Sequence, residues 1–308
     1  MPDRTTIISE SYAGLQAQAI GLAEAAGLPY QLQVIQARGL WRHVPARFWP
    51  NPRAAVALPP IETPLVMSVG GTSGVVASGL RRTDRPVIQV QHPRIDPARF
   101  DVVVVNRHDE LTGPNVIVTR TALHRVTPDR LAIEAARWRD RLAHLPRPLV
   151  AVLVGGSNGR FRFDAAVAAA LGADLARMMR QDRVGLALTP SRRTDAPVRA
   201  ALAGAVQPLG GWVWDMQGEN PYFGLLALAD AIIVTEDSVS MVSEAVATAA
   251  PVLLAGLPGK SRRIRLFTEL LRRDGRIRPF QGRLETWESA PLDDTPMAGA
   301  EIRHRLGL

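Results

Sequence analysis

The sequence predicts an α/β protein of two domains, each built on a parallel sheet, and three observations carry this prediction. Short apolar runs alternate with helical runs along the whole chain, the order that gives parallel sheets covered by helices. The chain has 308 residues, beyond the usual size of one domain. A Pro-Arg-Pro break at 146–148 precedes a restart of the same order. We therefore expect two Rossmann-like domains facing across a cleft, residues 1–146 and 149–280, followed by a tail at 281–308.

In the first half, runs rich in valine and isoleucine predict six strands, at 5–9, 32–35, 65–69, 87–91, 102–105 and 116–118. A helix is expected at 15–26, where apolar residues recur with helical spacing and Gly27 ends the pattern. A second helix is expected at 75–81. A third, strongly amphipathic helix is expected at 128–145.

The second half repeats the pattern, with strands expected at 149–154, 185–189, 212–214, 232–234 and 252–254. Helices are expected at 164–181, 221–229, 239–248 and 262–274. After Pro279 the chain becomes polar and irregular. A short helix at 296–306 has only a thin apolar face, and we expect it to pack onto the first domain.

Composition narrows the classes of function. There is no cysteine, which excludes disulfides, thiolate nucleophiles and cysteine-bound metals and fits the cytoplasm. Lys260 is the only lysine among 37 basic residues, and the net charge of +8 favours an anionic partner. The arginines are scattered without interleaved aromatic residues, so a nucleic-acid partner is not expected. No apolar run reaches the length needed to cross a bilayer, so we expect a cytoplasmic protein, at most peripheral to the inner membrane.

Four polar clusters follow predicted strands or open predicted helices in the second half. Ligands of open α/β sheets bind beyond the carboxyl ends of the strands, so these clusters are the candidate ligand-binding residues. They are Gly155, Gly156, Ser157, Asn158 and Arg160; Thr189, Ser191 and Arg192; Glu219 and Asn220; and Thr235, Glu236, Asp237, Ser238, Ser240 and Glu244.

Each cluster has a chemistry that suits a phosphate or a nucleoside. The glycine-rich turn at 155–159 lets backbone N–H groups approach a diphosphate, although it matches neither G-x-x-x-x-G-K-[ST] nor G-x-G-x-x-G. Hydroxyls and N–H groups at 235–240 lie at a helix start, where anions bind, and Glu244 follows one turn after Ser240. Arg192 offers bidentate phosphate contact. Plain turns and helix caps explain the same residues, and this alternative stays open.

The first half holds a fifth cluster after a strand, with Gly70, Gly71, Thr72 and Ser73, and Gln91 after the next strand. We expect these residues on the acceptor side of the cleft. His92 and Glu10 are the two candidates for a catalytic general base, and structural hydrogen bonding is the alternative for both. No H-x-x-x-H or Asp-x-Asp spacing is present, so no metal site is expected.

An aromatic and basic segment at 41–50 combines two tryptophans with two arginines and a histidine. Such a mixture rests at a bilayer surface when it is exposed. Packing between the domains explains it equally well, and the sequence leaves both open.

Three motifs carry a resemblance to a known family. They are Gly-Gly-Ser-Asn-Gly-Arg-Phe at 155–161, Gly-Glu-Asn-Pro-Tyr at 218–222 and Thr-Glu-Asp-Ser-Val-Ser-Met-Val-Ser-Glu-Ala at 235–245. With further matching segments over nearly the full length, the chain resembles the bacterial relatives of the plant elongated-mitochondria fission protein, a family described as GT-B-like glycosyltransferases. By the broader likeness to GT-B enzymes, Ser238 and Ser240 would contact a diphosphate and Glu244 the ribose hydroxyls.

The resemblance implies a glycosyltransferase that needs no metal or other cofactor and moves a sugar from a nucleotide diphosphate, of UDP type, to a lipid-linked or other envelope acceptor. Ser9–Gly14 stands where GT-B enzymes often have a glycine-rich first loop. Two alternatives are a non-catalytic adaptor of the mitochondrial-fission type and a nucleotide-sugar epimerase. The absence of G-x-G-x-x-G and of a Tyr-x-x-x-Lys pair speaks against an epimerase of the Rossmann type.

Overall fold

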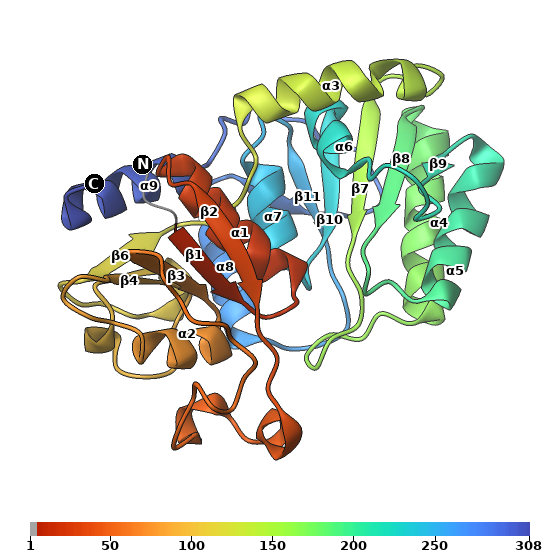
Figure 1. Ribbon diagram of the computed structural model, residues 1–308. Helices are drawn as coiled ribbons and strands as arrows, with labels where there is room; N and C mark the ends of the chain where they lie inside the picture. The colour runs from red at the N-terminus through yellow and green to blue at the C-terminus, as the bar shows by residue number, and fades with distance from the viewer. Residues whose placement is uncertain (1–4) are drawn as a thin grey trace. The chain divides into compact units, whose positions relative to one another are not determined.

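Two six-stranded parallel sheets organise the chain in the computed structural model, which describes residues 5–308 (Figure 1). The described chain divides into unit 1, residues 5–125 and 293–308, and unit 2, residues 126–292. The prediction of an α/β protein with two parallel sheets is confirmed.

The sheet of unit 1 has the strand order β2-β1-β3-β4-β5-β6. Its strands are β1 Thr5–Ser9, β2 Tyr30–Val34, β3 Leu65–Val69, β4 Val87–Val90, β5 Val102–Asn106 and β6 Val116–Thr119. Its helices are α1 Ala13–Ala25, α2 Gly71–Ser78 and α9 Thr295–Leu306. Successive side chains of a strand face opposite sides. Ile7 therefore packs in the cluster that contains Ile302 of α9, while Ile8 packs in the cluster that contains Val76 of α2.

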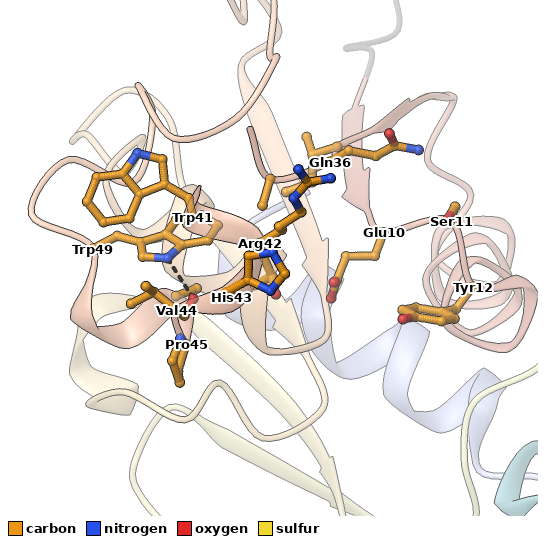
Figure 2. A pocket seen from close by; sticks show the side chains of 14 residues that line it. Glu10, Ser11, Tyr12, Gln36, Trp41, Arg42, His43, Val44, Pro45 and Trp49 are labelled. Atoms are coloured by element: carbon orange, nitrogen blue, oxygen red, sulfur yellow. Dashed lines mark hydrogen bonds between the residues drawn. The ribbon is translucent and has the colours of Figure 1, made fainter. Parts of the chain in front are cut away.

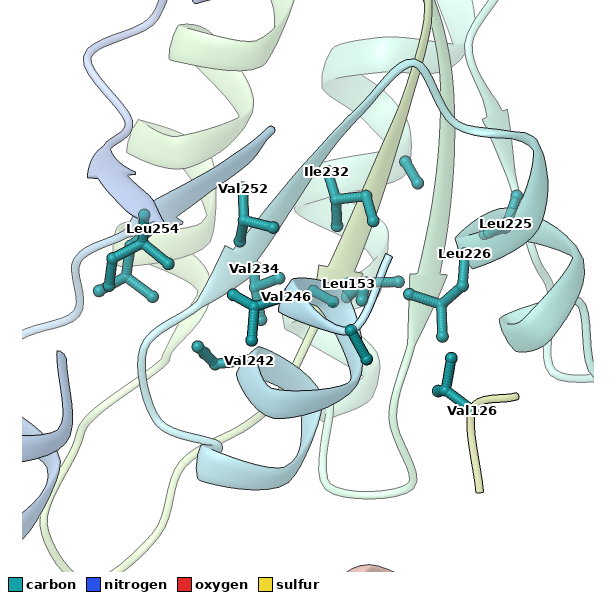
Figure 3. Close-up of a cluster of buried hydrophobic side chains, with 14 of the residues drawn as sticks. Val126, Leu153, Leu225, Leu226, Ile232, Val234, Val242, Val246, Val252 and Leu254 are labelled. Atoms are coloured by element: carbon teal, nitrogen blue, oxygen red, sulfur yellow. The ribbon is translucent and has the colours of Figure 1, made fainter. Parts of the chain in front are cut away.

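The sheet of unit 2 has the order β12-β11-β10-β7-β8-β9. Its strands are β7 Leu149–Val154, β8 Gly185–Pro190, β9 Trp212–Val213, β10 Ala231–Thr235, β11 Val252–Ala255 and β12 Ile277–Pro279. Its helices are α3 Pro128–Leu142, α4 Ala165–Asp182, α5 Ala196–Val206, α6 Tyr222–Leu228, α7 Val239–Val246 and α8 Arg262–Arg273. Figure 3 shows one of its two cores, where Ile232 and Val234 pack with Val242 of α7; Ile233 faces the other core.

The boundary between the units differs from the one expected at 146–148. It lies before α3, because the apolar face of α3 is part of the core of unit 2. Trp138 and Leu142 are buried there together with Leu225 of α6. The Pro-Arg-Pro segment is a turn within unit 2, where Arg147 pairs with Asp230. Likewise, residues 281–292 of the expected tail belong to unit 2, and α9 packs on α1 in unit 1.

Three elements differ from the sequence prediction. Helix α2 begins at Gly71 instead of residue 75, because Gly70 makes the turn with a φ of 86° and the following glycines form the first helical turn. Helix α5 was not predicted, although Val198, Leu202 and Val206 have the spacing of one buried helix face. The three-residue strand β12 was also missed, since so short a run carries little periodicity.

The packing of α3 on α6 can be tested by replacing Gly224 with alanine. A Cβ there would lie 2.4 Å from two ring atoms of Trp138, so we expect a loss of about 1–3 kcal/mol in the free energy of unfolding. The matched control is Gly204→Ala on α5, where a Cβ would meet nothing within 4 Å. That change should stabilise by about 0.5–1 kcal/mol, because alanine has the higher helix propensity. Urea unfolding measures the free energy of unfolding of both variants. Equal changes in the two variants would contradict the close packing of Gly224 on Trp138.

Candidate functional site

The carboxyl ends of three neighbouring strands of unit 2 bring together three of the predicted clusters. Strand β7 lies between β10 and β8. The loops that follow them therefore meet at one edge of the sheet, with Gly155 and Gly156 after β7, Ser191 after β8, and Asp237 after β10. Hydrogen bonds described below join these loops to one another.

Asp237 joins the three loops. Its side chain is fully buried, and its carboxylate accepts hydrogen bonds from the Gly156 N–H at 3.2 Å and from the Thr235 hydroxyl at 2.7 Å. The Arg193 guanidinium, 43% exposed, pairs with the same carboxylate at 2.8 Å and donates to the Gly156 carbonyl at 3.1 Å. A buried carboxylate needs such a charge partner. The anion held by the glycine turn in this structure is thus the chain's own Asp237.

The two glycines of this turn are required for packing. A Cβ at Gly155 would lie 2.2 Å from the carboxylate oxygens of Asp237, and a Cβ at Gly156 would lie 2.0 Å from the Arg193 carbonyl. The Gly155 N–H donates to the Thr235 hydroxyl at 2.8 Å. The two glycines therefore let the turn fit against the neighbouring loops, which agrees with the plain-turn alternative that the sequence left open.

The rest of the turn is shaped by its own side chains. The Ser157 hydroxyl accepts from the Phe163 N–H at 2.8 Å, and the side-chain Oδ1 of Asn158 accepts from the N–H groups of Arg160 and Phe161. Both residues and Arg160 are exposed. Their polar groups thus stabilise the loop and also lie at the surface, where a ligand can reach them.

After β8, the predicted residues have different surroundings. Thr189 is buried in the strand, and the Ser191 hydroxyl accepts from the Arg193 N–H at 3.2 Å. Thr194, which the sequence did not single out as a site residue, donates from its hydroxyl to the Gly155 carbonyl. Arg192 is exposed. Arg192 forms no ion pair among the described residues, whereas the neighbouring Arg193 pairs with Asp237.

Helix α7 begins at the predicted turn. Ser238 is its N-cap and accepts from the Met241 N–H at 3.3 Å. Ser240 is half-buried in the first turn, and the preceding Glu236 accepts from the Leu257 N–H at 2.6 Å. The helix start has the polarity that favours an anion.

Glu244 and Tyr222 form a buried pair of perturbed titratable groups in this unit. Its side chain is buried on α7 and accepts a hydrogen bond of 2.5 Å from the hydroxyl of Tyr222 on α6. Burial raises the pKa of Glu244 to about 7, and the tyrosine hydrogen bond opposes that shift. Burial and the nearby carboxylate raise the pKa of Tyr222 well above its usual value. Sequence reasoning gave Tyr222 no role, although it ends the Gly-Glu-Asn-Pro-Tyr motif.

The cluster before α6 is exposed. Glu219 forms ion pairs with Arg137 at 2.7 Å and Arg141 at 2.8 Å, both on α3. Asn220 accepts from the Tyr222 N–H at 3.0 Å. Glu219 therefore ties this loop to α3, and Asn220 sets the position of the tyrosine that holds Glu244.

Unit 1 has a pocket of about 530 Å³ at the carboxyl edge of its own sheet, and Figure 2 shows it from close by. Glu10, which follows β1, and Thr72 on α2 line it together with Arg42 and His43 from the loop after β2. Burial raises the pKa of Glu10, and a hydrogen bond with the Thr72 side chain opposes the shift. A carboxyl group with a raised pKa in a pocket is a typical candidate for acid–base work.

Of the predicted acceptor-side residues, Thr72 lines this pocket, whereas Gly70, Gly71, Ser73 and Gln91 are not among its lining residues. A Cβ at Gly70 would lie 3.7 Å from a carboxylate oxygen of Glu10. Gly71 lies in the first turn of α2, and Ser73 is fully buried with no hydrogen-bond partner for its hydroxyl in the described chain. Gln91 has a φ of 71° and donates to the side chain of Gln18 at 3.1 Å.

The two candidate bases differ in placement. Glu10 lines the pocket, whereas His92 is not among its lining residues and accepts from the Arg94 N–H at 3.0 Å through Nδ1. His43, which the sequence treated only as part of the aromatic segment, is the histidine of the pocket. Its position after the second strand was the signal that could have identified it.

Within residues 5–308, no group of three or more histidine and carboxylate side chains is arranged to hold a metal ion. In the same part of the chain, no helix is long and apolar enough to span a bilayer.

A family model described as "Mitochondrial fission ELM1" matches residues 13–306, nearly the whole chain. The chain belongs to this family. One relative is the "Mitochondrial fission protein ELM1" of Arabidopsis thaliana. It is 33% identical over 282 residues, and the match covers 79% of this chain. The chain spans 64% of the length of that plant protein. "Uncharacterized protein RP120" of Rickettsia prowazekii is 23% identical, with 79% of each chain covered.

Solved structures with the same fold place this ELM1-family chain in the GT-B class. The S. aureus MnaA–UDP co-structure has a TM-score of 0.58 at 12% identity and covers 99% of this chain and 97% of that one. UDP-GlcNAc 2-epimerase from Neisseria meningitidis bound to UDP-GlcNAc has a TM-score of 0.55 at 10% identity, with 98% and 100% covered. Medicago truncatula UGT71G1 complexed with UDP-glucose has a TM-score of 0.51 at 11% identity, with 98% and 89% covered. At these identities the likeness concerns the fold.

Proposed function

We propose that the protein is a glycosyltransferase that takes its sugar from a nucleotide diphosphate and works without a metal ion. The observation that carries the proposal is the buried carboxyl of Glu244, one turn after Ser240 on a serine-capped helix, in a chain of GT-B fold. Carboxyl groups whose pKa is strongly raised by burial cluster at functional sites. GT-B neighbours in complex with UDP, UDP-GlcNAc and UDP-glucose support a nucleotide-sugar ligand.

In this proposal the carboxyl edge of unit 2 holds the donor. The start of α7 with Ser238 and Ser240 and the exposed Arg192 and Arg160 would bind the diphosphate. Their positive potential stabilises the charge that develops on the leaving group, which is the work a metal ion does in other enzymes. Glu244 would accept hydrogen bonds from the ribose hydroxyls.

The loop at 219–220 would lie against the base. Asp237 and Arg193 have a supporting role, since their contacts hold the glycine turn and the neighbouring loops in place. The residues that face a ligand in this proposal are thus fewer than the sequence alone suggested.

The pocket of unit 1 would receive the acceptor. The acceptor hydroxyl attacks the anomeric carbon, the bond from that carbon to the phosphate oxygen breaks, and the nucleotide diphosphate leaves with the electron pair. The hydroxyl proton passes to a base, for which Glu10 is better placed than His92 because it lines the pocket. Its raised pKa makes it a stronger base than an ordinary carboxylate.

A nucleotide panel of UDP, GDP, CDP and ADP tests donor binding. A nucleotide at one hundred times its dissociation constant should stabilise the protein by roughly 2.7 kcal/mol, measured as a thermal shift. We expect one diphosphate to shift the unfolding of the wild type and Glu244→Ala to weaken its binding by at least about tenfold, the value of one lost hydrogen bond to a charged group. Affinity should also fall below pH 7, where Glu244 becomes protonated.

The control for this panel is Glu10→Gln, which removes the proposed base in unit 1 and should leave the nucleotide shift intact. The adaptor alternative predicts no shift with any of the four nucleotides. Equal shifts for the wild type and Glu244→Ala would contradict the role given to Glu244.

A nucleotide-sugar epimerase is the second candidate. It is favoured by the 2-epimerases among the structural neighbours, with TM-scores of 0.53 to 0.56. An epimerase converts the free nucleotide-sugar without an acceptor. Chromatography of a UDP-sugar incubated with the protein alone separates the two functions, since a new epimer would overturn the transferase.

A further inference from the structure

Residues 38–54 form a closed loop after β2, here called the docking loop. An antiparallel bridge between Ala37 and Val56 closes its base, and the Arg38 N–H donates to the Ala55 carbonyl at 2.8 Å. Trp49 anchors it from inside, because its ring is buried in the core that contains Ile8 and Val76. The loop is therefore a built feature with two fixed ends and a central anchor.

The docking loop exposes large apolar side chains that its anchor does not cover. Leu40 is 83% exposed and Phe48 is 62% exposed. They lie on two short 3-10 turns, Gly39–His43 and Ala46–Phe48, and Figure 1 shows these turns projecting from the sheet of unit 1. An apolar groove of about 510 Å³ beside them is lined by Leu40, Trp41 and Val44. Exposed apolar groups gathered on one loop mark an interaction surface.

The charge of the docking loop has one sign. Arg38, Arg42, Arg47 and Arg53 are all exposed, and the sequence contains no aspartate or glutamate between residues 24 and 62. The Arg47 guanidinium lies 4.7 Å from the centre of the Phe48 ring, so a positive group sits directly beside an exposed apolar one. Arginine stems beside aromatic rings fit the boundary between lipid headgroups and acyl chains.

We propose that the docking loop binds the surface of an anionic lipid bilayer, with Leu40 and Phe48 inserted at the headgroup level and the arginines against the lipid phosphates. A bilayer accounts for both features at once: the apolar tips need a non-aqueous medium, and the unbroken positive charge needs an anionic one. The docking itself does not depend on the proposed function.

The position of the loop has a consequence that does rest on the proposed function. Trp41 and Val44 line both the apolar groove and the pocket that contains Glu10. A docked loop would hold that pocket next to the bilayer, and the acceptor class would then be a membrane-borne lipid with a hydroxylated headgroup.

The test is co-sedimentation of the full chain with vesicles of phosphatidylcholine alone and of phosphatidylcholine with 30% phosphatidylglycerol. We expect binding to the anionic vesicles, little binding to the neutral ones, and release by 0.5 M NaCl. The double variant Leu40→Ser/Phe48→Ser should lower the partition coefficient by at least tenfold. Arg38→Gln and Arg47→Gln should each lower it roughly fivefold, the effect of one basic residue near such a surface.

Matched controls come from α3, where Ile133 is 67% exposed and Arg139 is exposed. Ile133→Ser and Arg139→Gln should leave the partition coefficient unchanged. No binding to either vesicle would overturn the proposal and leave an acidic protein as the partner of the loop. The proposal would also be overturned if the docking-loop variants had the same partition coefficient as the α3 variants. The nucleotide shift, measured on the docking-loop variants, reports separately on the proposed function, because the docking loop lies in unit 1.

Discussion

Replacing Glu244 with glutamine is expected to stabilise the protein at pH 8 and to do so much less at pH 5. Burial raises the pKa of Glu244 to about 7 in the folded state, against an ordinary value of 4.5. The folded state therefore keeps a proton that the unfolded chain releases between these values, and stability falls as the pH rises through this window. The difference between these two pKa values lowers the free energy of unfolding by about 3 kcal/mol above pH 7. Glutamine does not ionise and escapes this loss.

Urea unfolding at pH 5 and pH 8 measures the effect. The control Glu269→Gln removes a carboxylate from α8 whose side chain is 44% exposed. It should not reproduce the gain at pH 8. The variant Tyr222→Phe removes the hydrogen bond that lowers the pKa of Glu244, so its own stability should fall more steeply towards pH 8. A stability difference between Glu244→Gln and the wild type that is the same at both pH values would refute the assignment.

The second large effect is expected for Ile302→Asp on α9. Ile302 is fully buried against α1 and the sheet of unit 1. Truncating such a side chain costs about 2–5 kcal/mol, and a buried carboxylate without a partner adds to that cost. We expect a loss of at least about 4 kcal/mol and unfolding of unit 1 at room temperature.

The control is Met297→Asp on the same helix, where the side chain is 46% exposed and the effect should stay within about 0.5 kcal/mol. Trp41 and Trp49 lie in unit 1, so their fluorescence follows its unfolding. The nucleotide shift of unit 2 should persist in Ile302→Asp. A fully folded Ile302→Asp protein would show that α9 does not complete unit 1.

The sequence predicted the sheets well because buried parallel strands leave a local signal. Runs such as 102–105 and 232–234 are continuously apolar and bounded by polar turns. The boundary between the units left no such signal. It depends on which core receives the apolar face of α3, and that is decided by Trp138 and Leu225, far apart in the sequence. Helix α5 was missed although its own spacing was sufficient.

The sequence identified the loops of the candidate site but not most of their contacts. The loops after β7, β8 and β10 were identified, because strand ends can be read from the sequence. Their partners could not be read: Asp237 binds Gly156 and Arg193, and Glu219 binds two arginines of α3. Such pairs form between loops distant in the chain, and hydrogen-bonding capacity alone does not distinguish a ligand from a neighbouring side chain.

The path of the chain makes unit 2 an uninterrupted insertion within unit 1. The chain leaves unit 1 after Arg125 and re-enters it at Asp293. At this point the His124 Nε2 atom lies 3.3 Å from an Asp293 carboxylate oxygen, so the two ends of unit 1 almost touch. Excising residues 126–292 would require only a very short peptide to rejoin those ends. The excised segment would carry a whole sheet with its proposed donor edge. The rejoined unit 1 would carry the docking loop as a separate protein.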